Sequence, residues 1–268
     1  MRLAGRLTIY GEHLMSGEAF GLIAPSVLFL ADEDDGAAFP HPTYDPTRDS
    51  VRAMLLQQGA RTSRQIRGDL PFGYGFASST ALALLHLRTP VLAESLPFID
   101  SMDGVIHGFT PSGVDSQFYV RQRGGLYRLG EWVDVHDATL RWSGALLPKE
   151  GRFTLPEARA AIRRHRESLA ARAEGLTADL MKNGCVSHML LREYALDLLQ
   201  TGGYSGEARR LVQHALECGI VAKAIGGIYD KAILFLRCDR CCGATRTAMA
   251  ELETTVRAIV GSRWLPDV

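Results

Sequence analysis

Apolar and polar residues alternate along several short stretches of the N-terminal half, and this period of two predicts β-strands. The clearest alternation covers residues 5–10 and 62–69, and it returns in residues 125–147. Residues 21–30 form a more continuously apolar stretch, rich in β-forming side chains. Residues 31–50 are polar and turn-rich and are expected to lie on the surface. The N-terminal half is therefore predicted to contain a β-sheet.

A helical period marks other segments of the chain and dominates after residue 150. Thr154 and Glu157 form a capping box, with Pro156 in the first turn, which predicts a helix start at this point. An apolar strand is expected at residues 232–236. The predicted helices cover residues 51–58, 79–87, 91–106, 154–174, 186–199, 205–218 and 245–260. We therefore predict an α+β protein of two domains, residues 1–149 and 150–268.

Composition and charge exclude several classes of protein. The 268 residues are 46% hydrophobic and 22% charged, and 30 basic residues balance 30 acidic ones. A chain without net charge has no general attraction for nucleic acid or for anionic membranes. The arginines of residues 154–174 are interspersed with glutamates, which favours a solvated helix face over a nucleic-acid site. No apolar run approaches the roughly 20 residues that span a bilayer.

The N-terminal segment and the cysteines indicate the compartment in which the protein is expected. Charged residues interrupt the N-terminal segment, so no signal peptide is predicted, and we expect a cytoplasmic protein. The five cysteines are an odd number, and three of them cluster in residues 238–242. A structural zinc site needs a second cluster, which the two remaining cysteines do not form. Reduced thiols are therefore expected.

The first candidate binding site is a turn at residues 71–81 that contains two glycines. Glycine adopts positive φ values and lets backbone N–H groups approach an anion, and the helix that follows points its positive end at the same place. The sequence is neither a Walker loop nor a dinucleotide fingerprint. A capped helix without a ligand is the alternative interpretation. The candidate phosphate-binding residues are Gly73, Gly75, Phe76, Ala77, Ser78, Ser79 and Thr80.

Three further segments occur with this turn in a fixed order. They are residues 5–13, residues 103–115 followed by Gly124-Gly125, and residues 222–227 before the apolar strand. In this order the segments resemble the GHMP kinase superfamily, which includes galactokinase, homoserine kinase, mevalonate kinase and phosphomevalonate kinase. The mevalonate kinase branch is the closest, and the resemblance spans residues 5–236. It implies a two-domain GHMP kinase-like fold, with ATP and substrate in a cleft between the domains.

The resemblance also implies the roles of individual residues. Phosphoryl transfer from ATP needs a phosphate cradle, a divalent cation and a group that positions the attacking hydroxyl. Asp115 matches the catalytic aspartate that ends the Pro-Ser-Gly-x-Asp motif, and Arg6 matches a lysine that pairs with it. Ser79 and Asp103 match the magnesium ligands. If this holds, Arg6 and Asp115 must converge beside the phosphate-binding turn.

The same comparison implies a substrate. Glu12 and His13 match the Gly-Glu-His turn near the substrate, and Asp230 and Lys231 are further candidates for substrate binding. Galactokinases continue this turn with Thr-Asp, whereas this chain has Leu14-Met15, which disfavours a sugar. We therefore expect ATP- and Mg²⁺-dependent phosphorylation of a small, carboxylate-bearing alcohol, with mevalonate as the first candidate. No nucleic-acid or membrane partner is expected, and a homodimer is left open.

The chain departs from the family pattern at four places. Arginine replaces lysine at position 6, aspartate replaces glutamate at position 103, and one residue is added between His107 and Asp115. Residues 226–231 retain only two glycines of a glycine-rich loop. Fewer residues can therefore adopt the φ values of that loop and present their backbone N–H groups as it does. Two alternatives follow: a catalytically reduced protein that binds a nucleotide or metabolite, and an enzyme similar to diphosphomevalonate decarboxylase.

Overall fold

A computed structural model describes residues 1–15, 17–32, 66–72, 74–87, 91–107, 111–135, 140–148, 160–204, 206–225, 232–237 and 243–268. The chain divides into two compact units. The first comprises Met1–Leu7 and Ile23–Asp134, and the second comprises Thr8–Leu22 and Val135–Val268. The predicted domain boundary at residues 149 and 150 falls outside the described residues and stays a prediction. The predicted helix over residues 51–58 also lies outside them.

A five-stranded sheet contains the predicted N-terminal strands. Its order is β1-β2-β4-β5, and β3 pairs with β2. The bounds are β1 Arg2–Tyr10, β2 Gly21–Asp32, β3 Ile66–Gly68, β4 Gly125–Arg128 and β5 Glu131–Asp134. Strands β4 and β5 form an antiparallel hairpin in which Gly125 lies opposite Asp134. The strands predicted at residues 5–10 and 21–30 are confirmed, and both extend slightly beyond the predicted ends.

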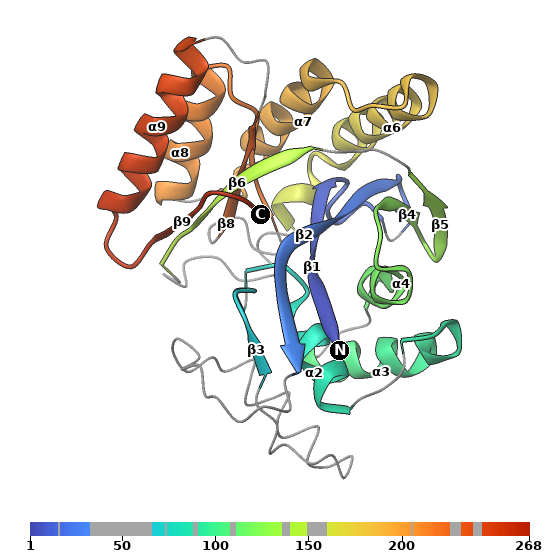
Figure 1. Cartoon of the computed structure of the whole chain (residues 1–268). Helices are drawn as coiled ribbons and strands as arrows, with labels where there is room; N and C mark the ends of the chain where they lie inside the picture. Colours follow the sequence, from blue (N-terminus) through green and yellow to red (C-terminus); the bar gives the residue numbers. More distant parts are fainter. Residues whose placement is uncertain are drawn as a thin grey trace. The chain divides into compact units, whose positions relative to one another are not determined.

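Three helices of the first unit pack against one another (Figure 1). They are α2 Ser78–Leu87, α3 Leu96–His107 and α4 Val114–Arg121, and a short 3-10 helix, η1 Ala93–Ser95, leads into α3. Ala81, Leu82 and Leu84 of α2 are at most 3% exposed, so α2 is a core helix rather than a surface helix. The helix predicted at residues 79–87 is confirmed. The one predicted at 91–106 begins later, at Leu96.

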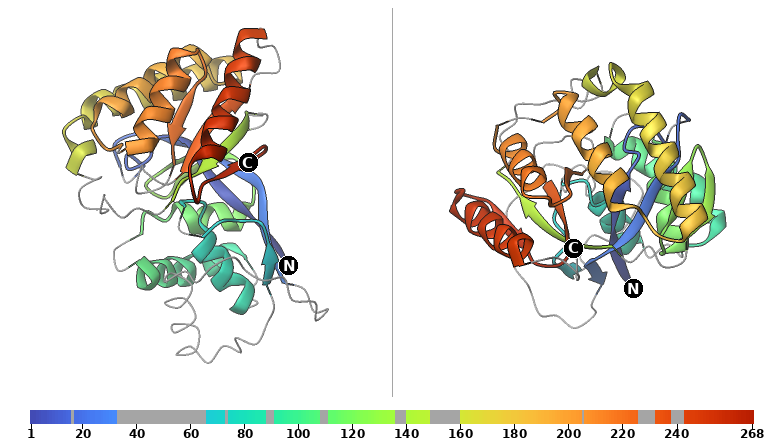
Figure 2. Two further views of the ribbon diagram at one scale, coloured as in Figure 1. Left: turned by 90° about the vertical axis from the view of Figure 1, so that its left-hand side faces the viewer. Right: turned by 90° about the horizontal axis from the view of Figure 1, so that it is seen from above.

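The second unit contains a four-stranded antiparallel sheet in the order β7-β8-β6-β9. Its strands are β6 Arg141–Leu146, β7 Ala222–Ala224, β8 Ala232–Arg237 and β9 Arg263–Leu265. Helices α8 Gly206–Glu217 and α9 Gly243–Ala258 lie beside each other along this sheet (Figure 2), and α8 contacts both β7 and β8. Buried Trp142 and Phe235 occupy its core.

Helices α6 Arg166–Asn183 and α7 His188–Gln200 pack together in the same unit. The single helix predicted over residues 154–174 is wrong in its extent, because the chain turns at residues 164–165 and α6 begins at Arg166. His165 has φ −115° and ψ 13°, which is not helical. The buried apolar face of α6 continues beyond Glu174 to Leu180, and the helix therefore extends to Asn183. Its buried residues are Leu169, Ala173, Leu176 and Leu180.

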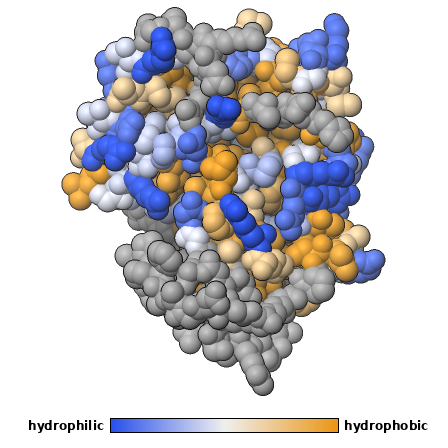
Figure 3. Space-filling view, viewed as in Figure 1, coloured by the Kyte–Doolittle hydropathy of each residue, from blue (hydrophilic) through white to orange (hydrophobic). Residues whose placement is uncertain are grey.

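The surface of the described residues mixes polar and apolar side chains. Figure 3 shows hydrophilic and hydrophobic residues interspersed on one face, as expected where single apolar residues reach the surface. Among the helices that the structure describes, none combines the length and the apolar character needed to cross a bilayer.

Candidate active site

Arg6 and Asp115 form an ion pair, with Arg6 Nε facing Asp115 Oδ1. Arg6 lies on strand β1 and Asp115 in the first turn of helix α4, and both belong to the first unit. Their side chains are only 11% and 15% exposed, so water screens their attraction less than it screens a surface pair. The predicted convergence of these two residues is therefore confirmed.

The start of helix α4 fixes the position of Asp115. Gly113 precedes the helix with φ +77°, and a Cβ atom there would meet the Tyr127 hydroxyl oxygen at 2.9 Å. The Ser116 hydroxyl donates to the Gly113 carbonyl oxygen at 2.8 Å and also contacts the Asp100 carboxylate. Glycine is thus required at position 113 both for its backbone conformation and for space.

The glycine turn lies directly beside Arg6. The backbone N–H of Arg6 donates to the Phe76 carbonyl oxygen at 3.0 Å. Gly75 and Ala77 both have positive φ, +82° and +56°, and such alternating conformations direct successive N–H groups into one concavity. For alanine this left-handed conformation costs roughly 1–2 kcal/mol. Gly73 lies outside the described residues.

Helix α2 begins at the end of this turn with three hydroxyl side chains. Ser78, Ser79 and Thr80 are all at most 6% exposed. No acidic residue occupies the first turn of α2. The first N–H groups of a helix have no acceptor within the helix itself, and together with the helix dipole they favour a bound anion at this end.

Asp103 on helix α3 contacts the start of α2. Thr80 Oγ1 donates to Asp103 Oδ1 at 2.9 Å, and Asp103 is 7% exposed. The predicted magnesium-ligand roles require Asp103 to lie close to Ser79. In the structure Asp103 contacts Thr80, the residue that follows Ser79. His107 ends helix α3, and its side chain is outside the described part of the chain.

Glu12 and His13 belong to the second unit, where a buried polar cluster surrounds Glu12. Lys223 of strand β7 is completely buried; its ammonium group pairs with Glu12 Oε1 and donates to the Thr8 carbonyl oxygen at 2.9 Å. Glu12 Oε2 is also buried, and no described residue donates a hydrogen bond to it. A buried acceptor of this kind is costly, so it indicates a place for a ligand donor or a water molecule.

The turn at Glu12 is held by two further features. Gly11 has φ +86°, and a Cβ atom there would meet the Gly21 Cα at 2.5 Å. The Gly11 N–H donates to the Tyr194 hydroxyl oxygen at 2.9 Å. Burial raises the pKa of Tyr194 well above 10, and the nearby Glu12 carboxylate raises it further. The tyrosine therefore stays protonated.

Two predicted substrate-binding residues, Asp230 and Lys231, lie outside the described residues. Sequence reasoning missed two buried residues that contact the predicted ones, Lys223 and Tyr119. The signal for Lys223 was present, because a lysine inside the apolar stretch 220–225 has to be buried with a partner. Tyr119 had no comparable signal, since aromatic residues are common in helix interiors.

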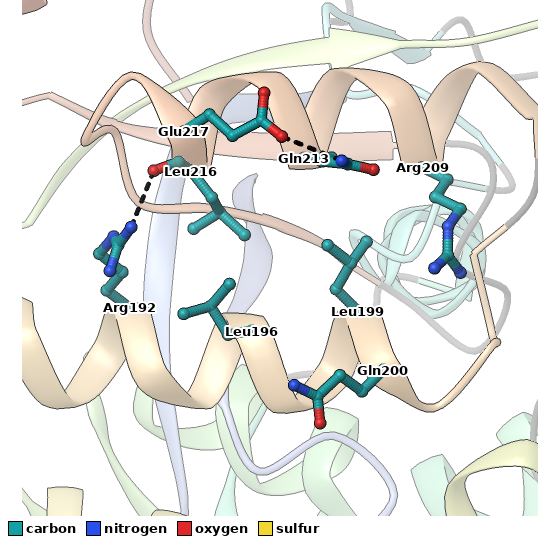
Figure 4. A pocket seen from close by; sticks show the side chains of 8 residues that line it. All are labelled: Arg192, Leu196, Leu199, Gln200, Arg209, Gln213, Leu216 and Glu217. Carbon is teal, nitrogen blue, oxygen red and sulfur yellow. Dashed lines mark hydrogen bonds between the residues drawn. The ribbon is translucent and has the colours of Figure 1, made fainter.

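A groove in the second unit is lined by none of the predicted site residues. It lies between α7 and α8, has a volume of about 320 Å³, and contains Leu196, Leu199 and Leu216 (Figure 4). Arg192 donates to the Leu216 carbonyl oxygen at 3.1 Å at one end of the groove. This groove is separate from the residues predicted to bind nucleotide or substrate.

A scan against protein-family models and a search of curated proteins returned no match. Solved structures do match over nearly the whole chain. Methanococcus jannaschii mevalonate kinase aligns with a TM-score of 0.71 at 9% identity, covering 100% of this chain and 98% of its own. L. major mevalonate kinase, solved in complex with R-mevalonate, aligns with a TM-score of 0.67 at 15% identity, covering 99% of this chain and 95% of its own.

A phosphomevalonate kinase is also among the matching structures. The Streptococcus pneumoniae enzyme, in complex with phosphomevalonate and AMPPNP, aligns with a TM-score of 0.59 at 15% identity, covering 99% of each chain. These identities are too low to transfer an activity, but the full-length alignments establish the architecture. This chain has the α+β fold of the GHMP kinases, with mevalonate kinases among its structural neighbours.

Proposed function

We propose that this protein is an ATP-dependent phosphotransferase that phosphorylates a hydroxyl group of a small metabolite. The observation that carries the proposal is the buried ion pair between Arg6 and Asp115, together with the hydrogen bond from Arg6 N to Phe76 O. A carboxylate and a guanidinium therefore lie next to a turn whose backbone is suited to bind an anion. Phosphoryl transfer depends mainly on positioning and on charge stabilisation, which these groups can supply.

Each group has a role in the proposed reaction. The turn at residues 73–77 and the start of α2, including Ser78 and Thr80, bind the ATP phosphates through backbone N–H groups and hydroxyls. Asp115 holds the substrate hydroxyl and accepts its proton as the oxygen bonds to the γ-phosphorus and the bond to the β–γ bridging oxygen breaks. Arg6 keeps Asp115 oriented and stabilises negative charge on the transferred group.

The residues present fit a magnesium ion. Ser79 and Asp103 offer hard oxygen donors, both nearly buried, and the Thr80 hydrogen bond keeps the Asp103 carboxylate at the start of α2. Among the described residues no group of three acidic, histidine or cysteine ligands occurs, but Mg²⁺ binds through one or two carboxylates, waters and substrate phosphates. When bound, Mg²⁺ would neutralise phosphate charge.

The substrate proposal is a small alcohol that carries a carboxylate, with R-mevalonate as the first probe. Glu12 and His13 are proposed to bind this acceptor. The buried Glu12 Oε2, to which no described residue donates, is suited to accept a hydrogen bond from a ligand hydroxyl. Asp230 and Lys231 are proposed to bind it as well. The presence of R-mevalonate in the L. major structure supports the choice of probe.

A screen of metabolite alcohols that follows ADP release tests this function. The full chain is incubated with ATP and Mg²⁺, and R-mevalonate and L-homoserine are included in the panel. Acceptor-dependent ADP release that EDTA abolishes is the expected result. Turnover of no alcohol, with AMPPNP still bound, would instead favour the nucleotide-binding alternative, which the altered loop at residues 226–231 suggests. Carbon dioxide release from a diphosphorylated acid would favour the decarboxylase alternative.

A further inference from the structure

Tyr119 connects the helix that carries Asp115 to the phosphate-binding turn. It lies on α4, one helical turn after Asp115, and is completely buried. Its hydroxyl donates to the Ala77 carbonyl oxygen at 2.8 Å. The neighbouring Phe118 ring contacts the Tyr119 ring edge-on, with centroids 5.2 Å apart, which limits the rotation of the tyrosine. One hydrogen bond therefore joins two segments that are more than 40 residues apart.

The acceptor of this bond is the last residue of the turn. The Ala77 carbonyl oxygen also accepts the N–H of Ala81 at 3.1 Å, the first hydrogen bond at the start of α2. Ala77 has φ +56°, a conformation that side chains other than glycine adopt only when their surroundings impose it. The direction of the N–H groups at the start of α2 therefore depends on what holds Ala77 in place.

The tyrosine keeps its proton in this environment. Burial raises the pKa of Tyr119 well above 10, and the Asp115 carboxylate raises it further, while Arg6 acts in the opposite direction. The hydroxyl therefore keeps its proton near neutral pH and can donate. A phenylalanine would fill the same space and remove only this donor.

We propose that Tyr119 is a positioning residue that fixes the phosphate-binding turn relative to Asp115. Its hydroxyl holds Ala77 in the left-handed conformation, so that the N–H groups of residues 75–79 converge on the nucleotide phosphates. Because Tyr119 and Asp115 share one helix, the same contact sets the distance between the bound phosphates and the carboxylate. The inference rests on the proposed function, since it requires that the turn binds a nucleotide.

The first test compares Tyr119→Phe with Tyr10→Phe in the full chain. Tyr10 is equally buried, and its hydroxyl forms a 3.1 Å hydrogen bond with Thr177 Oγ1 in the second unit. AMPPNP with Mg²⁺ is the probe, and calorimetry gives its dissociation constant. Loss of one well-placed hydrogen bond predicts about tenfold weaker AMPPNP binding in Tyr119→Phe. Tyr10→Phe should bind AMPPNP like the wild type, although both variants lose a hydrogen bond made by a buried tyrosine.

The second test uses Ala77→Gly, because glycine adopts positive φ without the steric cost that alanine has. If the tyrosine acts by holding Ala77, Tyr119→Phe should weaken AMPPNP binding much less in the Ala77→Gly background than in the wild type. An equal loss in both backgrounds would overturn the mechanism, as would unchanged AMPPNP binding in Tyr119→Phe.

These measurements distinguish a failure of the inference about Tyr119 from a failure of the proposed function. A wild-type chain that binds no AMPPNP contradicts both proposals. If the wild type binds AMPPNP and turns over an acceptor, but Tyr119→Phe has wild-type affinity and wild-type KM for ATP, only the role of Tyr119 is wrong. A fall in melting temperature alone, equal in Tyr119→Phe and Tyr10→Phe, would show that the tyrosine has only a structural role.

Discussion

Two contacts join Asp115 and its helix α4 to other segments of the first unit. Arg6 pairs with its carboxylate, and Tyr119 anchors the helix on which it lies. A carboxylate so nearly buried is stable in its charged form only beside a partner charge. The ion pair therefore keeps this carboxylate largely out of water, and the proposed role of Asp115 as a base is the one that can be tested most directly.

Asp115→Asn should remove turnover while leaving nucleotide binding intact. The amide keeps the shape of the side chain but cannot accept the proton, and general-base catalysis is worth on the order of 10²–10⁴ in rate. Steady-state kcat for the acceptor found in the screen, together with the AMPPNP dissociation constant, gives the measurement. Asp134→Asn is the control, because Asp134 pairs with Arg123 on the surface. Undiminished kcat in Asp115→Asn would show that this carboxylate does not act on the substrate.

Some of these contacts could be predicted from the amino-acid sequence, and others could not. The motif around Asp115 and the strand with Arg6 were recognisable from their residues, and the structure joins them. The hydrogen bond from Thr80 to Asp103 was not predicted, because only packing decides which hydroxyl of a helix meets a carboxylate on its neighbour, and the magnesium-ligand roles of Ser79 and Asp103 stay predictions. Tyr119 and Lys223 were missed since their partners lie 42 and 211 or more positions away.

At the scale of elements, helix α4 begins where it does because of Gly113. The backbone there is left-handed, and the Tyr127 hydroxyl fills the space in which a side chain would lie. The helix that presents Asp115 is thus started by a glycine rather than by a side-chain cap. Any side chain at this position must either change the backbone conformation or displace Tyr127.

Gly113→Ala is expected to lower both stability and kcat. Left-handed alanine costs roughly 1–2 kcal/mol, and the clash with Tyr127 adds an overpacking cost of about 1–3 kcal/mol. If Asp115 acts as proposed, displacement of its carboxylate by about an ångström can reduce the rate by about 10². Gly184→Ala is the matched control, because Gly184 has φ +70° with no atom within 4 Å of the added Cβ. Urea unfolding and kcat should show a loss of stability alone in the control; equal kcat in both variants would contradict the prediction.

Strand β7 carries a buried lysine that stabilises the turn before β2. Lys223→Met should destabilise the protein by about 3–5 kcal/mol, because it leaves the Glu12 carboxylate buried without a partner charge. Adding Glu12→Gln removes that charge and should restore most of the loss, which urea denaturation can measure. Arg257→Met is the control, since the exposed pair of Arg257 with Glu253 contributes about 0.3–0.5 kcal/mol. A double variant no more stable than Lys223→Met would show that the pair is not the cause.

For the whole molecule, the division into two units does not follow the order of the sequence. Residues 8–22 belong to the unit that contains the C-terminal half, although they precede most of the first unit. The predicted nucleotide-binding residues that the structure describes lie in the first unit, whereas Glu12 and His13 lie in the second. Nucleotide and acceptor are therefore assigned to groups that belong to different units of the chain.

Nucleotide binding should stabilise the folded chain. A ligand that binds only the native state at 100 times its dissociation constant adds about 2.7 kcal/mol to the free energy of unfolding. The melting temperature should therefore rise with AMPPNP and Mg²⁺ in both the wild type and Asp115→Asn, as thermal unfolding at several AMPPNP concentrations can show. AMP, which lacks the β- and γ-phosphates, serves as the control and should have a smaller effect. No dependence on AMPPNP concentration would contradict the assignment of a nucleotide site.

The sequence by itself determined the α+β class, most of the described strands and helices, and the glycine turn before α2. These features depend on residues close together in the chain, where a period of two or 3.6 and the freedom of glycine act locally. Tertiary structure decided which distant side chains meet: Arg6 with Asp115, Thr80 with Asp103, and Lys223 with Glu12. The physical reason is that a periodic pattern defines which face of an element is buried, whereas the partner of a buried charge depends on how the elements pack together.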